Sequence, residues 1–302
     1  MENYNYMKCI MYHYIRDKNK RYPYWNFVSK KKFINQLKFF TLNSQQLKPY
    51  DELYFSKNLN ILTFDDGFKD HLWAAEKLKE NNLMGIFFIP SLPYKNNKIL
   101  DVHRAHLILG KIDAKYAYEK LLELLKKKKY SNFINIKNEI RFNKLYANHK
   151  DNKFKKEFKK IINYFGNIKT KSLLLDELCK YFKINETVKS FYLSKKEIRY
   201  LSQLGMVIGS HSESHTVLSG LNFNQQMTEI KNNKVFLEKI INKKIDYFCY
   251  PYGGKMSYNS DTLKILKKLN FRYGFSTYPK KITNHIYKFK PLEMPRLDCN
   301  KF

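Results

Sequence analysis

The sequence has few of the residues that mark several classes of protein. Four cysteines occur among 302 residues, at positions 9, 179, 249 and 299, and no two of them form a CxxC pair. This spacing excludes a disulfide framework and a thiolate zinc site, so we expect four free thiols. The longest apolar run, MGIFFIP at 84–90, is much shorter than the roughly 18 residues of a membrane-spanning helix. We therefore expect no transmembrane helix.

The start of the chain also lacks the pattern of a secretion signal. The segment MENYNYMKCIMYHYI carries an acid at position 2 and has neither a long apolar core nor a cleavage site of small residues. We therefore expect a cytoplasmic protein.

Acidic residues are scarce relative to basic ones. The chain has 57 Lys and Arg against 27 Asp and Glu, which gives a net charge of +30. Such a surplus is one sign of a nucleic-acid binder. Here, however, the lysines are scattered among many Asn, Ile, Tyr and Phe, a mixture also typical of an AT-rich genome. We expect no specific nucleic-acid partner, and a steep salt dependence of DNA or RNA binding would contradict this.

The remaining composition predicts a globular α/β protein. Hydrophobic residues make up 43% of the chain, including 24 Tyr and 23 Phe, which is enough for a large core. Residues 1–100 and 196–302 alternate short strand-like runs with helix-like stretches, whereas 101–190 shows only helical spacing of leucines and aromatics. We interpret 1–302 as one α/β domain with a mostly helical insertion at 101–190.

Two adjacent carboxylates follow an apolar, strand-like run in ILTFDDGF (61–68). Neighbouring side chains at the end of a strand can both face one site and have different roles there. Buried like charges repel each other, and a bound cation is the usual remedy. Asp65 and Asp66 are therefore candidate site residues, although a solvated turn explains many such triplets.

A second candidate motif, HSESH, follows the strand-like run MVIG. His211 and His215 stand at i and i+4, which on one helical turn places both imidazoles on the same face. Surface helices also carry this spacing by chance. Two histidines and one carboxylate would leave open positions for water and substrate, as in a catalytic metal site.

Taken together, TFDDG, HSESH and YPYGG resemble the motifs of the NodB-homology polysaccharide deacetylases, carbohydrate esterase family 4. MYHYI near the start, LSKKEIRYLSQLGMVIGSH and LNFRYGFST are similar to family segments in their usual order, and only the 101–190 region falls outside the resemblance. The resemblance implies a distorted (β/α)7 barrel, one bound divalent metal, and hydrolysis of an N-acyl group on an amino sugar.

The resemblance also implies roles for individual residues. Asp66, His211 and His215 match the family's metal ligands, and Asp65 matches its catalytic base. The backbone N–H of Tyr252 matches the donor that holds the oxyanion. Zinc suits these ligands, with Co, Ni, Fe and Mn as alternatives.

The chain departs from the family pattern at the third motif. Cys249 occupies the position where many members have an Arg that pairs with the catalytic Asp. A subgroup similar to the poly-N-acetylglucosamine deacetylases also lacks this Arg. We expect Arg296 in EMPRLDC to supply a replacement cation, with an ordinary ion pair near the C-terminus as the alternative.

The acid that protonates the leaving amine has no clean motif match. His285 in ITNHIYK lies in the right part of the chain and is our candidate, with His13, His103 and His106 as rivals. Two further histidines are expected on the solvated surface: His71 and His149. Tyr250 and Tyr252 would either stack on a sugar ring or pack in the core.

We therefore predict a metal-dependent hydrolase that removes an acetyl or formyl group from an amino sugar in surface-glycan biosynthesis. The lysines of 101–190 are compatible with a nucleotide- or lipid-linked substrate and with peripheral contact with an anionic membrane surface. The alternative is an inert NodB-like domain that binds a glycan or an anionic surface.

Overall fold

The computed structural model describes residues 6–143 and 151–302, which form two compact units. The first unit comprises Met1–Asp17, Phe27–Lys98 and Val188–Phe302, and the second comprises Lys18–Asn26 and Ile99–Thr187. The second unit thus contains most of the helical segment expected at 101–190. It also includes residues 18–26, which the sequence pattern groups with the first α/β segment.

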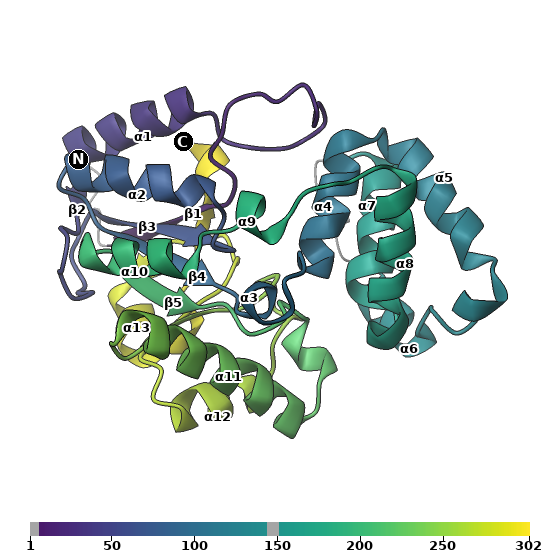
Figure 1. The fold of residues 1–302 in the computed structure, drawn as a ribbon. Helices are drawn as coiled ribbons and strands as arrows, with labels where there is room; N and C mark the ends of the chain where they lie inside the picture. The colour runs from purple at the N-terminus through teal and green to yellow at the C-terminus, as the bar shows by residue number, and fades with distance from the viewer. Residues whose placement is uncertain (1–5, 144–150) are drawn as a thin grey trace. The chain divides into compact units, whose positions relative to one another are not determined.

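The first unit is built on a curled, mainly parallel sheet (Figure 1). Along the sheet the strands are β7 (Tyr273–Phe275), β6 (Tyr247–Cys249), β5 (Val207–Ser210), β4 (Gly85–Ile89), β3 (Leu59–Asp65), β1 (Tyr6–Tyr12) and β8 (Ile282–Thr283). Two short strands pair outside this path: β2 (Gln45–Gln46) with β3, and β9 (Leu297–Asp298) with β1. Only β8 runs antiparallel to its neighbour among these pairs.

One segment near residue 296 brings the two sides of the curled sheet together. Met294 forms a parallel bridge to Phe275 at the end of β7, and β9 then pairs with β1 in the register Ile10 to Leu297. This closure, with helices packed around parallel strands, confirms the expected distorted (β/α)7 barrel.

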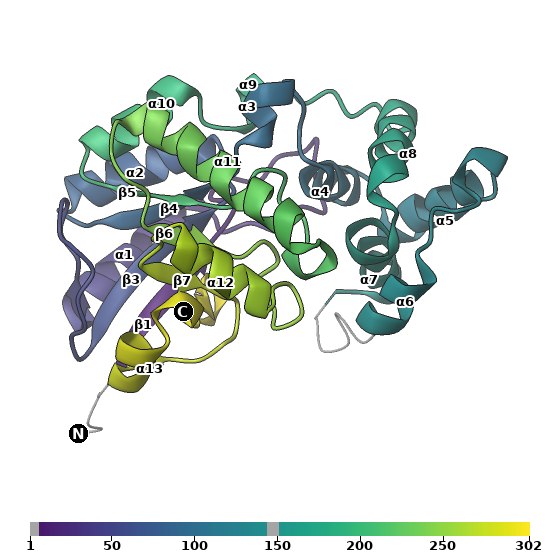
Figure 2. The ribbon, with the colours of Figure 1, turned by 90° about the horizontal axis from the view of Figure 1, so that it is seen from below.

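Helices surround the sheet of the first unit, and Figure 2 shows α11 lying beside α10 and α12. They are α1 (Lys30–Asn43), α2 (Asp70–Glu80), α3 (Leu92–Asn96), α9 (Val188–Phe191), α10 (Lys195–Gln203), α11 (Phe223–Ile241), α12 (Ser260–Lys268) and α13 (Asn284–Phe289). One of them, α13, packs Ile286 and Tyr287 against the core inside the barrel. The longest of them, α11, begins at a capping box in which Asn222 and Gln225 satisfy each other's backbone N–H groups.

Alternating side chains of the strands fill two cores. On β3, Leu62 and Phe64 pack outward against the helices, whereas Leu59 and Ile61 pack inside the barrel with Phe88 and other apolar residues. Because side chains alternate along a strand, Asp65 lies on the inward face with Ile61.

The register of the parallel strands brings their carboxyl ends to one edge. Asp65 pairs with Phe88, Ile89 with Ser210, and Ser210 with Phe248. The residues that follow β3, β5 and β6 therefore meet at this edge, which is where barrels of this type gather their sites.

The described part of the second unit consists mainly of helices joined by turns. It contains α4 (Asp101–Lys111), α5 (Ala114–Leu125), α6 (Ile136–Phe142), α7 (Lys153–Lys160) and α8 (Ile168–Tyr181), with a π-helical turn at Ile161–Phe165. Its core is made by side chains such as Ile108, Leu121, Phe158 and Leu175. Among the described residues of 101–187, no strand is present and the only β-bridge joins Ile134 to Gly166.

Candidate metal and catalytic site

The two adjacent aspartates lie at the carboxyl end of β3 and are both buried, at 2% exposure each. Asp65 is the last strand residue, and Asp66 and Gly67 then adopt positive φ values of 81° and 63°. Non-glycine residues rarely take this conformation. The sharp turn ends the strand and lets the second carboxylate face the same edge as the first.

Asp65 forms a bidentate ion pair with Arg296. Arg296 Nη1 donates to Asp65 Oδ1 and Nη2 donates to Oδ2, each at 2.7 Å. Burial is the largest single influence and raises the pKa of this carboxyl, but the charge and hydrogen bonds of Arg296, together with smaller contributions from His13 and His211, outweigh it, so the pKa of Asp65 lies below its usual value. Asp65 is therefore ionised at neutral pH.

The remaining N–H groups of Arg296 also contact acceptor atoms of the protein. Nε donates to Ser276 O at 3.1 Å, Nη1 also donates to Thr63 Oγ1 at 3.1 Å, and Nη2 also contacts Cys249 Sγ at 3.0 Å. The side chain is 1% exposed. A cation thus stands beside Asp65, as expected for a replacement of the missing third-motif Arg, and the small Cys249 side chain lies against it.

Asp66, His211 and His215 form a compact group of three candidate metal ligands. Their ligand atoms all lie within 4.8 Å of one another. Asp66 Oδ1 is 3.5 Å from His211 Nε2 and 3.4 Å from His215 Nε2. A buried set of two imidazoles and one carboxylate is the donor chemistry of a divalent catalytic metal.

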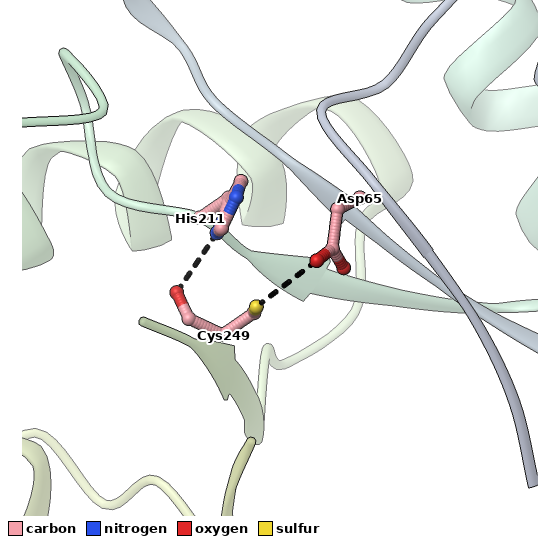
Figure 3. Close-up of side chains that lie close together, drawn as sticks. All are labelled: Asp65, His211 and Cys249. Atoms are coloured by element: carbon pink, nitrogen blue, oxygen red, sulfur yellow. Dashed lines mark hydrogen bonds between the residues drawn. The ribbon is translucent and has the colours of Figure 1, made fainter. Parts of the chain in front are cut away.

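The hydrogen bonds of His211 fit this assignment. Its Nδ1 lies 2.9 Å from the carbonyl oxygen of Cys249, as Figure 3 shows. A carbonyl oxygen only accepts, so Nδ1 carries a proton, and Nε2, which faces Asp66, is the ring atom left to bind a metal. The residues present therefore fit a metal ion.

The expected helical turn at HSESH is wrong. Residues 211–217 form a loop, in which Ser212 and His215 have positive φ values of 58° and 56°. The His215 N–H donates to Ser212 Oγ at 3.1 Å, a side-chain turn that competes with helix formation. The two imidazole rings still meet edge to face, with centroids 4.7 Å apart.

Cys249 connects the two halves of the site. Besides accepting from His211 through its carbonyl, it places its thiol 3.6 Å from Asp65 Oδ2 (Figure 3). Burial raises the pKa of this thiol. Cys249, like the other three cysteines, is a free thiol, as the sequence predicts.

The structure places His13, and not His285, beside the carboxylates. His13 Nε2 lies 3.8 Å from Asp65 Oδ2. His285 is exposed on α13, which follows Thr283, the partner of Tyr6 at the opposite end of β1. About six strand residues, or roughly 20 Å, separate that end from the site. The prediction of His285 as the acid is therefore wrong for geometric reasons.

Among the remaining histidines, His71 differs from expectation. His103 and His106 lie on α4 of the second unit. His71 is fully buried rather than solvated, with ring contacts to Phe64, Phe68 and Phe87. The last one, His149, falls outside the described residues.

A sequence signal for the burial of His71 does exist. His71, Ala74, Ala75 and Leu78 follow the i, i+3, i+4, i+7 spacing of an apolar helix face. The buried His71 Nε2 lies 2.7 Å from the carbonyl oxygen of His13 and so fixes the backbone that carries that histidine.

The two tyrosines of YPYGG have different surroundings. Tyr250 is 1% exposed, donates its hydroxyl to Leu292 O at 2.5 Å, and stacks on Tyr258. It is a core residue. Tyr252 has a positive φ of 63° and places its ring 5.0 Å from that of His215. Of the two, only Tyr252 adjoins the metal-ligand group.

Within the described residues, no helix is both long and apolar enough to cross a bilayer.

Two solved structures resemble this fold over most of the chain. The deacetylase PplD from Streptococcus pyogenes, solved in complex with acetate, has a TM-score of 0.58 and 17% identity, and the match covers 97% of this chain and 92% of that one. IcaB from Ammonifex degensii has a TM-score of 0.53 and 12% identity, with 97% and 90% covered. At these identities the likeness shows the fold.

Sequence comparison supplies the family. A curated relative from Bacillus subtilis (strain 168), "Putative polysaccharide deacetylase YxkH", is 30% identical over 88 residues, which is 29% of this chain and 30% of the relative. The chain thus matches less than a third of that relative's length. The family model described as polysaccharide deacetylase matches residues 111–274, more than half of the chain and a range that includes both candidate histidine ligands. The chain therefore belongs to the polysaccharide deacetylase family, a family of hydrolases.

Proposed function

We propose that this chain is a metal-dependent hydrolase that cleaves the N-acyl amide of an amino sugar. The observation that carries this proposal is the buried group of Asp66, His211 and His215 next to an ionised Asp65. Family membership supports the reaction class. Acetyl is the expected acyl group, with formyl as the alternative.

Asp66, His211 and His215 would hold one divalent ion, zinc first, or Co, Ni, Fe or Mn. Bound there, the ion would supply Lewis-acid chemistry that polarises the amide carbonyl and acidifies water.

Asp65 is the general base in this proposal. Each of its oxygens accepts one N–H from Arg296, and Oδ2 also lies 3.6 Å from the Cys249 thiol. Oδ1 has a second lone pair, so the carboxylate can still take a proton from an attacking water. Arg296 acts through Asp65: it fixes the carboxylate plane and keeps it ionised. The lowered pKa weakens Asp65 as a base but ensures that the basic form is present.

His13 is the general acid in this proposal. Its Nε2 lies 3.8 Å from Asp65 Oδ2, and its side chain is 40% exposed and so can meet a substrate. From this position it would donate a proton to the leaving amine nitrogen. The backbone N–H of Tyr252 would donate to the oxyanion, and the Tyr252 ring beside His215 would border the sugar.

A nucleotide- or lipid-linked precursor in surface-glycan assembly is the substrate we propose. The net charge of +30 supports an anionic carrier, and it is also compatible with peripheral contact with an anionic membrane surface. The cytoplasmic location belongs to the same proposal.

The test is amine release from a panel of N-acetyl and N-formyl amino sugars, each free, nucleotide-linked and lipid-linked. Metal-stripped protein, metal-restored protein and Asp65→Asn are compared. Asp70→Asn is the matched control, because Asp70 also pairs with an arginine, Arg16, at 2.5 Å but lies outside the site. We expect turnover that needs both metal and Asp65.

Two results would oppose the proposal. Metal binding at one ion per chain without turnover on the panel would favour an inert NodB-like domain that binds a glycan or an anionic surface. Failure to bind any divalent metal would reject the site itself.

A further inference from the structure

The loop that carries His215 holds an unfavourable backbone conformation. Ser212 and His215 both have positive φ, which residues with a Cβ rarely adopt. Within the loop, one hydrogen bond from His215 N–H to Ser212 Oγ supports this shape. His215 can face Asp66 only while the loop keeps this conformation, so contacts from outside the loop matter for the ligand geometry.

The helix α11 supplies such a contact through Glu229. Its Oε2 accepts the backbone N–H of Ser214 at 2.8 Å, and its Oε1 accepts the Ser214 hydroxyl at 2.7 Å. Ser214 directly precedes His215. A carboxylate that takes both donors of one residue fixes the position and the orientation of that residue.

A second contact from the same helix lies one turn later. Asn232 Nδ2 donates to Glu213 Oε2 at 2.7 Å. The other Glu213 oxygen is ion-paired with Lys95, and the Glu213 carbonyl accepts the N–H of Leu92 at 2.9 Å. Residues three apart lie on the same helix face. Glu229 and Asn232 therefore form hydrogen bonds to two adjacent loop residues, Ser214 and Glu213.

We propose that Glu229, assisted by Asn232, is a positioning residue that sets the metal affinity of this site by holding the loop of His215. The inference rests on the metal site of the proposed function. It assigns to α11 a role beyond packing: in Glu229→Gln one acceptor oxygen becomes an amide NH2 donor, so one of the two Ser214 donors loses its acceptor and the strained loop relaxes. His215 Nε2 then moves away from Asp66 and His211.

The test compares Glu229→Gln with Glu238→Gln. Glu238 is a matched control because it lies on the same helix, also accepts a backbone N–H, that of Ile245 at 3.0 Å, and pairs with Lys234, but does not contact the loop. Zinc affinity is measured by competition with a chromophoric chelator, and the visible spectrum of the cobalt(II) form reports ligand geometry. Thermal unfolding of the metal-free variants shows whether each is folded.

We expect Glu229→Gln to weaken zinc binding at least tenfold and to change the cobalt spectrum, because groups that orient metal ligands typically contribute 10–100-fold in affinity. Glu238→Gln should bind zinc like the parent. Equal zinc affinity and an unchanged cobalt spectrum in Glu229→Gln would overturn the inference.

Ser214→Ala provides a second route that does not alter the helix. It removes the hydroxyl donor to Glu229, and we expect it to weaken zinc binding less than Glu229→Gln does. The double variant should lose less zinc-binding free energy than the sum of the two single-variant losses, because both substitutions act on one contact. Fully additive losses would show that Glu229 does not act through Ser214.

These outcomes separate the inference from the proposed function. A parent protein that binds zinc without any turnover would reject the hydrolase and leave the role of Glu229 testable by affinity alone. A parent that turns over substrate, with zinc affinity unchanged in Glu229→Gln, would reject the inference and keep the hydrolase.

Discussion

Arg296 and Asp65 lie 231 positions apart in the sequence, yet two parallel hydrogen bonds of 2.7 Å join their side chains in the barrel interior. Neither side chain is more than 3% exposed. A planar guanidinium is suited to this bidentate contact, and a lysine could not reproduce it. The pair therefore links the end of β3 to the segment that closes the sheet.

Replacing Arg296 by Met should destabilise the protein and shift its pH dependence. Removing one partner of a buried ion pair typically costs about 3–5 kcal/mol in the free energy of unfolding, because the other charge stays buried. Without the guanidinium, burial is the largest remaining influence on Asp65 and raises its pKa, against smaller opposing contributions from His13 and His211. Urea unfolding measures the first effect, and the pH profile of kcat/KM, whose acid limb should move to higher pH, measures the second.

The sign of the wild-type effect follows from the lowered pKa. The pKa of Asp65 is lower in the folded than in the unfolded protein. Asp65 therefore stabilises the fold at pH values above its unfolded-state pKa, and this stabilisation is lost as the pH falls through its folded-state pKa. Arg272→Met is the control, because Arg272 pairs with Glu52 at the surface and should change stability by less than about 1 kcal/mol. An acid limb unmoved in Arg296→Met would contradict our account of this pair.

His13→Gln should lower kcat by about 10²–10⁴ if His13 is the general acid. Zinc affinity should not change, because His13 is not among the three ligands. The matched control is His285→Gln, which alters an exposed histidine at the opposite end of β1 and should keep full activity. Steady-state kinetics decide between the two, and a large loss of kcat in His285→Gln would restore the histidine that the sequence favours.

Metal removal should lower the thermal stability. Zinc at about 100 times its Kd should add about 2.7 kcal/mol to the free energy of unfolding, provided that the unfolded chain does not bind it. His211→Ala should abolish this increment, because Nε2 of His211 is one of the three ligand atoms. Unfolding curves with and without zinc measure it, and an equal zinc increment in His211→Ala would place the metal elsewhere.

His71 should make stability depend on pH. Burial lowers the pKa of His71 to about 4, whereas an unfolded histidine titrates near 6.5. The stabilisation is thus complete above about pH 6.5 and is lost as pH falls to about 4, by about 3 kcal/mol in all. Urea unfolding at several pH values should show a smaller decline in His71→Phe. An equal decline in both proteins would show that His71 does not titrate in this way.

Local motifs predicted much of this molecule. TFDDG ends a strand and HSESH follows one, and parallel strands bring their carboxyl ends together, so a meeting of the aspartate pair with His211 and His215 could be expected from position. The family resemblance identified Asp66 as the ligand of the pair. Alternation of helix-like and strand-like segments predicted an α/β protein, and the family resemblance implied the distorted barrel.

Contacts set by long-range register were harder to predict. The sequence favours His285 over His13, but the antiparallel pairing of β8 with the start of β1 places His285 at the far end of that strand, whereas His13 lies beside Asp65. The i, i+4 spacing of the histidines in HSESH predicts a helical turn, but a loop can bring the two imidazole rings together as well. The hydroxyl of Ser212 and the carboxylate of Glu229 hold the loop form, and the latter lies on a different element.

The pairing of Ile10 with Leu297 has a consequence for the order of folding during synthesis. At ~5–20 residues per second, roughly 15–60 s pass between the synthesis of β1 and that of β9. Until then β1 has an exposed edge, and Asp65 has no guanidinium to neutralise it. A nascent chain is thus exposed to edge-to-edge association for most of its translation, and Asp65 gains its ion pair only when residue 296 has been synthesised.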